Sequence, residues 1–189
     1  TMRAFLALDL SAETRAKLAQ VQAVLKTETV HVKWVDPDLM HLTLRFFVDL
    51  QPEQQNKLHP AMTEVARRSA SFTYKVRGVG FFASGDRLKV LWCGVDDPTG
   101  RLAALQKTVE QSLAPLRLAH EERPFRAHLT LGRLKEPSRE PQLVQALKTM
   151  TNLEAGVERP DRVRLYQSTL TPEGPIYRVL AEWRLGAGA

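Results

Sequence analysis

The 189-residue chain carries 27 Lys and Arg against 21 Asp and Glu, a net charge of +6, with 43% hydrophobic and 25% charged residues. This composition is ordinary for a soluble globular protein, and the length suits one large domain or two small lobes around a shared cleft. No apolar run approaches the roughly 20 residues that a membrane-spanning helix needs. The mild positive charge permits an anionic partner such as nucleic acid without requiring one.

The first half of the chain predicts strands alternating with helices. Strands are predicted over residues 3–10, 31–35, 40–48, 72–82 and 87–95, with the last two joined as a hairpin by turn residues. Helices are predicted after Ser11, which suits an N-cap, and from Pro52, which suits a first helical turn.

The second half repeats this order. Helices are predicted from Pro98 and over residues 142–150, and strands over residues 126–134, 162–169 and 176–185. Hairpins segregated among helices favour the α+β class over a doubly wound parallel sheet. Because no low-complexity linker divides the chain, we expect residues 1–189 to form a single two-lobed domain.

The chain has a single cysteine, Cys93, so an internal disulfide framework is excluded. This usage fits a reducing cytoplasm. Cys93 lies in the apolar run 90–93, which predicts a buried, inert thiol and not a nucleophile. Residues 2–9 are too short for a signal peptide, and we expect a cytoplasmic protein.

The tetrapeptide His-Leu-Thr-Leu occurs twice, at residues 41–44 and 128–131, each time inside a predicted strand. Residues two apart on a strand share a face, so each copy presents an imidazole beside a hydroxyl, with the leucines turned to the core. One copy alone indicates a half-buried strand with a hydrogen-bonded histidine. Two copies are more informative, because the chain has only five histidines and a titratable group in an apolar strand is costly without a task or a partner.

Other chemistries fit this pattern less well. Zinc sites take three or four His, Cys or carboxylate ligands, whereas the two motifs supply two histidines and no adjacent carboxylate or cysteine. The Gly-x-Ser-x-Gly elbow of serine hydrolases, the Walker loop and the Gly-x-Gly-x-x-Gly fingerprint are all absent from the sequence. Two proton-transfer groups and two hydroxyl donors suit in-line attack on a phosphate. The remaining histidines, His31, His59 and His120, lack a matching threonine and are predicted to be surface or capping residues.

The doubled motif, with a spacing of 87 residues from His41 to His128, resembles the two-histidine phosphoesterases. The similarity is greatest to their bacterial and archaeal branch, the RNA 2′,3′-cyclic phosphodiesterases, first called 2′-5′ RNA ligases. It extends over nearly the whole chain, through residues 2–10, 32–35, 125, 128–133, 165–168 and 174–177. The family usually has Phe-Leu-Gly after the first motif, where this chain has Phe46-Phe47-Val48, and Pro before the second histidine, where it has Ala127.

The resemblance implies two similar lobes of antiparallel sheet with helices outside, related by a pseudo-twofold axis. Each lobe would carry one motif facing a central cleft. It assigns His41 as the proton donor and His128 as the proton acceptor, an order that the residues alone leave open. Thr43 and Thr130 would donate hydrogen bonds to the phosphate oxygens, and no metal or other cofactor is needed.

Further residues are candidates for substrate binding. Arg126 and Arg45 share a face with the motif histidines by strand alternation, whereas Arg133 needs a bulge at Gly132 to join them. A structural ion pair is the alternative for Arg133, and a solvated surface position for Arg126 and Arg45. Phe46 and Tyr166 are candidates to stack a terminal base, with core packing as the alternative for Phe46.

The sequence therefore predicts a metal-independent hydrolase, monomeric, that opens 2′,3′-cyclic phosphate ends of RNA, such as tRNA fragments or nucleotides, to 2′-phosphates. Two alternatives stay open. The same residues could join tRNA halves through a 2′-5′ linkage, or the chain could be a non-catalytic RNA-binding module that retains the fold.

Overall fold

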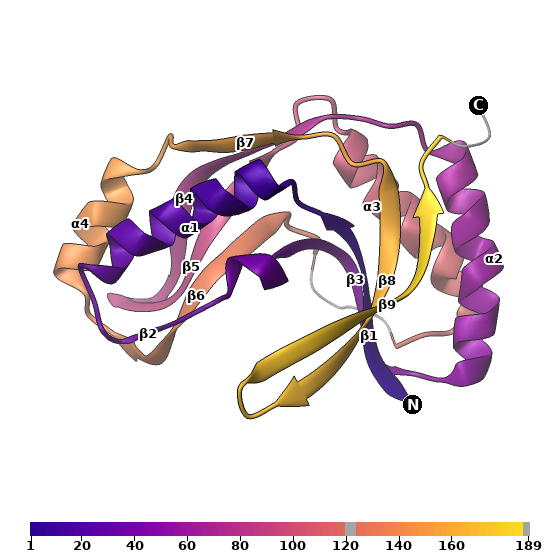
Figure 1. The fold of residues 1–189 in the computed structure, drawn as a ribbon, viewed down its shortest axis with the longest axis horizontal. Helices are drawn as coiled ribbons and strands as arrows, with labels where there is room; N and C mark the ends of the chain where they lie inside the picture. The colour runs from indigo at the N-terminus through magenta and orange to yellow at the C-terminus, as the bar shows by residue number, and fades with distance from the viewer. Residues whose placement is uncertain (120–123, 187–189) are drawn as a thin grey trace.

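The computed structural model describes residues 1–119 and 124–186, and it places the amino-terminal strand in the middle of a four-stranded antiparallel sheet (Figure 1). The strands of this sheet lie in the order β3–β1–β8–β9: β3 (His41–Leu50), β1 (Met2–Asp9), β8 (Arg162–Thr171) and β9 (Gly174–Arg184). The hairpin of β8 and β9 extends beyond the body of the protein.

A second antiparallel sheet has five strands. They lie in the order β2–β6–β5–β4–β7: β2 (Val32–Trp34), β6 (His128–Ser138), β5 (Arg87–Asp96), β4 (Tyr74–Ser84) and β7 (Glu154–Glu158). Each sheet takes strands from both halves of the chain, so the two rounds of elements seen in the sequence do not fold as separate lobes. Each sheet still contains one motif strand, β3 or β6.

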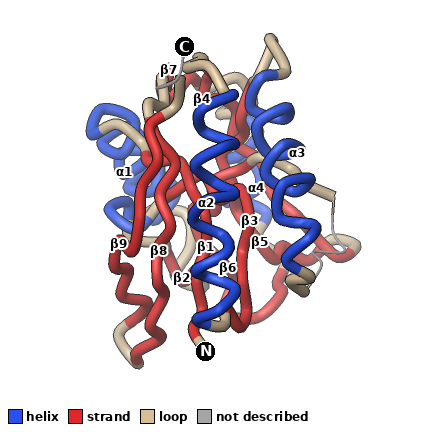
Figure 2. Tube along the Cα trace, turned by 90° about the vertical axis from the view of Figure 1, so that its right-hand side faces the viewer, coloured by secondary structure: helices blue, strands red, loops and turns tan. Residues whose placement is uncertain are grey.

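Helices lie on the outside of both sheets, as expected for the α+β class. α1 (Ala12–Lys26) and α4 (Pro141–Thr149) pack against the five-stranded sheet, while α2 (Pro52–Arg68) and α3 (Arg101–Leu113) pack together against the four-stranded sheet. Figure 2 shows α2 and α3 side by side in front of the strands. Two short 3-10 helices, Pro37–Leu39 and Ala114–Leu116, complete the described elements. None of the helices in this part of the chain has the length and apolarity to cross a membrane.

Local side-chain contacts set where the helices begin. The Ser11 hydroxyl accepts the Thr14 amide at 3.2 Å, so Ser11 caps α1 as predicted. α3 begins at Arg101 and not at Pro98: the Asp97 carboxylate accepts the Ala103 amide at 3.1 Å, and Gly100 at the cap has φ of 71°. The residues around Pro98 therefore form a turn ahead of the helix.

Strand β7 was not predicted from the sequence, because its five residues carry a glycine and a weak alternation. Gly156 is required there by close packing: a Cβ at this position would lie 2.0 Å from the Thr14 hydroxyl oxygen of α1. Glu158, at the end of β7, accepts the Ser11 hydroxyl at 2.9 Å. The strand thus ties the first helix to the edge of the five-stranded sheet.

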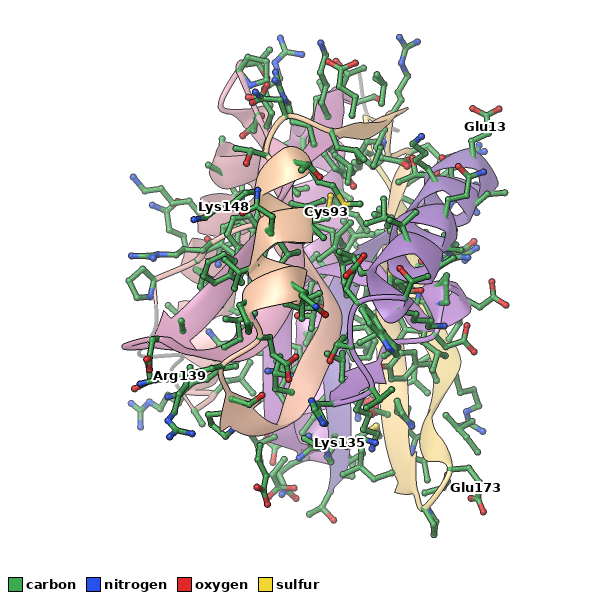
Figure 3. The ribbon with its side chains drawn as sticks, turned by 90° about the vertical axis from the view of Figure 1, so that its left-hand side faces the viewer. Glu13, Cys93, Lys135, Arg139, Lys148 and Glu173 are labelled. Atoms are coloured by element: carbon green, nitrogen blue, oxygen red, sulfur yellow. The ribbon has the colours of Figure 1, made fainter. Side chains whose placement is uncertain are left out.

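Cys93 lies in the hydrophobic core and is fully buried, as predicted. Figure 3 shows it in the interior, whereas the charged side chains of Glu13, Arg139, Lys148 and Glu173 extend outward. Burial raises the pKa of the Cys93 thiol to about 12, so the thiol is protonated and unreactive at neutral pH.

Candidate active site

The two His-Leu-Thr-Leu motifs meet where the two sheets come together. His41 begins β3, at the edge of the four-stranded sheet, and His128 begins β6 of the five-stranded sheet; the two strands contact each other. Both motifs line one open cleft with a volume of about 400 Å³. Of the sequence-predicted site residues, those lining this cleft are His41, Thr43, Phe46, Arg126, His128, Thr130 and Arg133.

A bulge in β3 decides which residues after Thr43 face the cleft. Ala7 of β1 pairs with Thr43, but the neighbouring Leu6 pairs with Arg45, so Leu44 is an extra residue. A bulge of one residue reverses the alternation beyond it. Phe46 therefore takes the cleft face that strict alternation assigned to Arg45.

A matching bulge lies in β6. Trp92 of β5 pairs with Thr130 and Leu91 pairs with Gly132, so Leu131 is the extra residue. As a result Arg133 lies on the cleft face with Thr130, as predicted for a strand that bulges next to Gly132. A Cβ at Gly132 would lie 2.5 Å from Val32 Cγ1, so the glycine lets β2 pack against β6.

The two catalytic candidates hold their imidazole rings in the same way. Nδ1 of His41 lies 3.0 Å from the carbonyl oxygen of Leu39, and Nδ1 of His128 lies 2.8 Å from that of Arg126. A carbonyl can only accept, so each Nδ1 carries a hydrogen. Nε2 is therefore the atom of each ring that is available to exchange a proton with a substrate.

The surroundings of the two rings differ. The His41 side chain is only 7% exposed, and its Nε2 lies 3.4 Å from Oδ1 of Asp9. Burial lowers the pKa of His41 below its ordinary value, although the Leu39 carbonyl and the Asp9 carboxylate act to raise it. His128 lies at a more open position, where the Phe82 ring packs edge-on at 5.8 Å between centroids.

Arg45 lies outside the cleft, contrary to its assignment to the histidine face. Its side chain is buried by the β3 bulge, forms an ion pair with Glu110 of α3 at 2.5 Å, and donates to the Ala119 carbonyl. These contacts connect β3 to α3, so the position of Arg45 is that of a structural residue.

Tyr166 is likewise absent from the cleft lining. It is buried, packs its ring against His41 with 4.6 Å between centroids, and donates its hydroxyl to Asp9 at 2.5 Å. The Tyr166 ring therefore packs against the His41 ring, and because Tyr166 is buried, it has no free ring face on which a base could stack.

Several lining residues were not singled out from the sequence. They are Arg3, Phe5, Val35, Leu39, Met40, Phe125, Leu129, Ser168, Leu170, Pro175 and Tyr177. The Arg3 guanidinium lies 5.0 Å above the Phe46 ring, and Tyr177 packs edge-on against Phe5. Asp9 was also missed, and its pairing with His41 across β1 and β3 is the contact that reveals it. Pairing register was the missing signal, since all of these residues except Leu129 lie outside the two His-Leu-Thr-Leu motifs.

The other histidines have separate partners. His31 lies 2.6 Å from the Glu140 carboxylate, and the His59 ring packs against Trp183 with 5.1 Å between centroids. His120 lies outside the described residues.

Comparison with known proteins places the chain in a family. The family model for LigT-like phosphoesterases matches two successive segments, residues 8–92 and 94–177. The first segment contains His41 and the second contains His128. The chain therefore belongs to the LigT-like phosphoesterase family, which confirms the resemblance inferred from the doubled motif. The double match supports the predicted pseudo-twofold relation, which remains a prediction.

Individual relatives agree with this assignment. A protein of Methanothermobacter thermautotrophicus named RNA 2′,3′-cyclic phosphodiesterase is 33% identical over 97% of this chain and 99% of its own length. A protein of that name from Thermus thermophilus is 33% identical over 97% of this chain and 90% of its own length. Among solved structures, TT0787 of Thermus thermophilus has 28% identity and a TM-score of 0.78, with 98% of each chain covered. Escherichia coli LigT, solved with 3′-AMP, shares the fold with a TM-score of 0.76 at 24% identity over 97% of this chain and 98% of that one.

Proposed function

We propose that this protein hydrolyses the 2′,3′-cyclic phosphate end of RNA to a 2′-phosphomonoester, using two histidines and no metal. The observation that carries the proposal is the convergence of the two motifs, from different sheets, on one cleft, each with Nδ1 held by a main-chain carbonyl. The names of the relatives support the choice of substrate.

In this mechanism His128 takes a proton from water as the water oxygen bonds to phosphorus. The bond from phosphorus to the ribose 3′ oxygen breaks, and His41 Nε2–H protonates that oxygen. The products are a 2′-phosphate and a 3′-hydroxyl. General acid or base catalysis by one such group contributes roughly 10² to 10⁴ in rate. The order of donor and acceptor follows the family resemblance.

The remaining cleft residues would hold the phosphate and the terminal nucleoside. Thr43 and Thr130 would donate hydroxyl hydrogen bonds to the non-bridging oxygens, where negative charge increases in the transition state. Arg133, on the same face as Thr130, would pair with the phosphate, and the exposed Arg126 would attract the RNA backbone. Phe46 would stack the terminal base.

The direct test is turnover of an oligonucleotide with a 2′,3′-cyclic end in the presence of EDTA, with the product identified as a 2′-phosphate. We expect full activity in EDTA. Absence of turnover, or turnover only after metal is added, would contradict the proposal.

The first alternative is 2′-5′ joining of tRNA halves, in which a 5′-hydroxyl replaces water as the nucleophile. Mass spectrometry of the products separates the two reactions, because joining yields a longer chain. We expect hydrolysis to dominate because no sequence feature visibly excludes water from the cleft.

A non-catalytic RNA-binding module is the second alternative. The variants His41→Ala and His128→Ala distinguish it, because an enzyme loses turnover while it still binds cyclic-ended RNA, whereas a binding module has no turnover to lose. We further propose a monomeric, cytoplasmic protein. Light scattering of the purified protein tests the first point and fractionation of cells that express it tests the second.

A further inference from the structure

A carboxylate that the two-histidine mechanism leaves unused lies beside His41. Asp9, the last residue of β1, pairs directly with His41 of β3, and its Oδ1 lies at ion-pair distance, 3.4 Å, from His41 Nε2. Two neighbours on β8 hold the carboxylate: Tyr166 donates its hydroxyl to Oδ1 and Arg164 donates Nη1 to Oδ2, both at 2.5 Å. The Asp9 carboxylate is therefore held close to the His41 imidazole.

This placement favours one charge state of the ring. Because Nδ1 donates to the Leu39 carbonyl, Nε2 of a neutral His41 carries a lone pair, and this electron-rich atom lies 3.4 Å from a negative carboxylate, which is unfavourable. Protonation of Nε2 changes the repulsion into an attraction between opposite charges. The Nδ1–H group then donates to the Leu39 carbonyl, and the positively charged ring lies at ion-pair distance from the Asp9 carboxylate.

The other groups around His41 act in the opposite direction. Burial of the ring is the largest influence and lowers its pKa, and the cations Arg15 of α1 and Arg164 of β8 lower it further. Arg15 lies close, with Nη2 3.5 Å from the Met40 carbonyl. Glu182 of β9 partly balances Arg164, with its carboxylate 3.0 Å from Arg164 Nε.

Two tyrosines complete the surroundings, and both stay neutral near pH 7. Burial and the bond to Asp9 raise the pKa of Tyr166 to about 12, and burial raises the pKa of Tyr177, whose ring lies 5.6 Å from that of His41. Tyr166 therefore remains a donor to Asp9. Asp9 is the side chain that opposes the neutral, buried state of His41.

We propose that Asp9, held by Tyr166 and Arg164, is a positioning residue that keeps the proton on His41 Nε2 until the leaving oxygen takes it. The inference rests on the proposed function, in which His41 is the acid. After each turnover His41 has lost one proton and His128 has gained one. Exchange with solvent resets both, and Asp9 favours the return of the proton to His41.

The test is an NMR titration of the His41 ring in the wild type and in Asp9→Asn. We expect the substitution to lower the pKa of His41 by about one unit or more, as loss of an adjacent opposite charge does. Glu182→Gln is the matched control: it also removes a carboxylate bonded to Arg164, but that carboxylate does not contact His41, so a clearly smaller shift is expected. Asp9→Glu keeps the charge and should retain most of the wild-type pKa, which separates charge from shape.

Kinetics supply the second readout. The limb of the kcat/KM profile that reports the His41 proton should move to lower pH in Asp9→Asn by the shift seen in the NMR titration, and Glu182→Gln should move it clearly less. A His41 pKa that is unchanged or raised in Asp9→Asn would overturn the inference. The titration needs no turnover, so its result stands apart from failure of the proposed function, which would appear as an inactive wild-type protein.

Discussion

His41 and His128 are held by equivalent bonds, each from Nδ1 to the carbonyl oxygen two residues earlier, at 3.0 Å and 2.8 Å. The two rings are therefore fixed in the same tautomer. If one histidine donates a proton and the other accepts one, the difference must come from their surroundings. The His41 side chain is nearly buried beside Asp9, whereas the bond from His128 to the Arg126 carbonyl lies at an exposed position. This difference underlies the expected pH dependence.

Activity towards a cyclic phosphate should be bell-shaped in pH, because the active form needs a protonated His41 and a neutral His128. Burial lowers the pKa of His41 in the free protein, whereas a bound phosphate anion raises it by attraction. Because kcat/KM reports the free enzyme and kcat the complex, the limb that reports the His41 proton should lie at lower pH in the profile of kcat/KM than in that of kcat. Steady-state rates from pH 5 to 9 test this. A flat profile with chemistry rate-limiting would contradict the paired acid and base.

The threonines should affect rate without affecting pH dependence. Thr43→Val and Thr130→Val keep the strand and the side-chain volume but remove a hydroxyl donor to the phosphate, so kcat should fall by roughly 10 to 10³. The pH optimum should stay in place because neither residue titrates. Thr108→Val is the control, since Thr108 lies on α3 and bonds its own helix at Ala104. An unchanged rate in both motif variants would remove the threonines from the site.

Arg133 and Arg45 should behave in opposite ways. Arg133→Ala should reduce kcat/KM by roughly 10² or more, because a charged donor to the transition state is lost, with little change in stability.

Arg45→Met should leave turnover of the folded protein unchanged but lower the free energy of unfolding by roughly 3 kcal/mol, since Glu110 loses its buried partner. Urea unfolding and initial rates on both variants distinguish these outcomes. A loss of turnover in folded Arg45→Met would show that Arg45 reaches the substrate.

These two arginines show what could be predicted from the sequence and what could not. The motifs could be located in the sequence, but the face on which each neighbouring arginine lies could not be deduced from it. The repeated motif predicted that the two histidines and the two threonines share one site, and all four line the cleft, while their chemical roles stay predictions. The segregated hairpins predicted the α+β class. The face of the strand on which Arg45, Phe46 and Arg133 lie depends on an extra residue in each motif strand. A bulge is defined by pairing with another strand, so alternation along one strand misplaces every residue beyond it.

The same reason explains the missed residues. Asp9 lies 32 positions before His41 in the chain, yet the two are paired across β1 and β3. Tyr166 was predicted as a candidate to stack a terminal base, whereas in the structure it is buried and its ring packs against that of His41. Which strands belong to which sheet also could not be predicted from the sequence, because each sheet combines strands from both halves of the chain.

Cys93 should be inert in the folded protein. Its thiol is fully buried and its pKa is raised to about 12 by burial, so almost no thiolate exists at pH 8. A thiol reagent should label it only after unfolding in guanidinium, and Cys93→Ala should retain full turnover. Rapid labelling of the native protein at pH 8 would contradict the burial.

His41 should also make stability depend on pH. Its pKa in the folded protein lies below its ordinary value, while in the unfolded chain it titrates near about 6.5. At a pH between these two pKa values the unfolded state binds more protons than the folded state, so a fall in pH favours unfolding. The stability from a neutral, buried His41 is fully present above about pH 6.5 and is lost as pH falls through that window. Urea unfolding at intervals from pH 8 to pH 5 should therefore show a steeper loss of unfolding free energy in the wild type than in His41→Gln, which has no ring to titrate. Equal slopes in the two proteins would show that burial of His41 does not oppose its protonation.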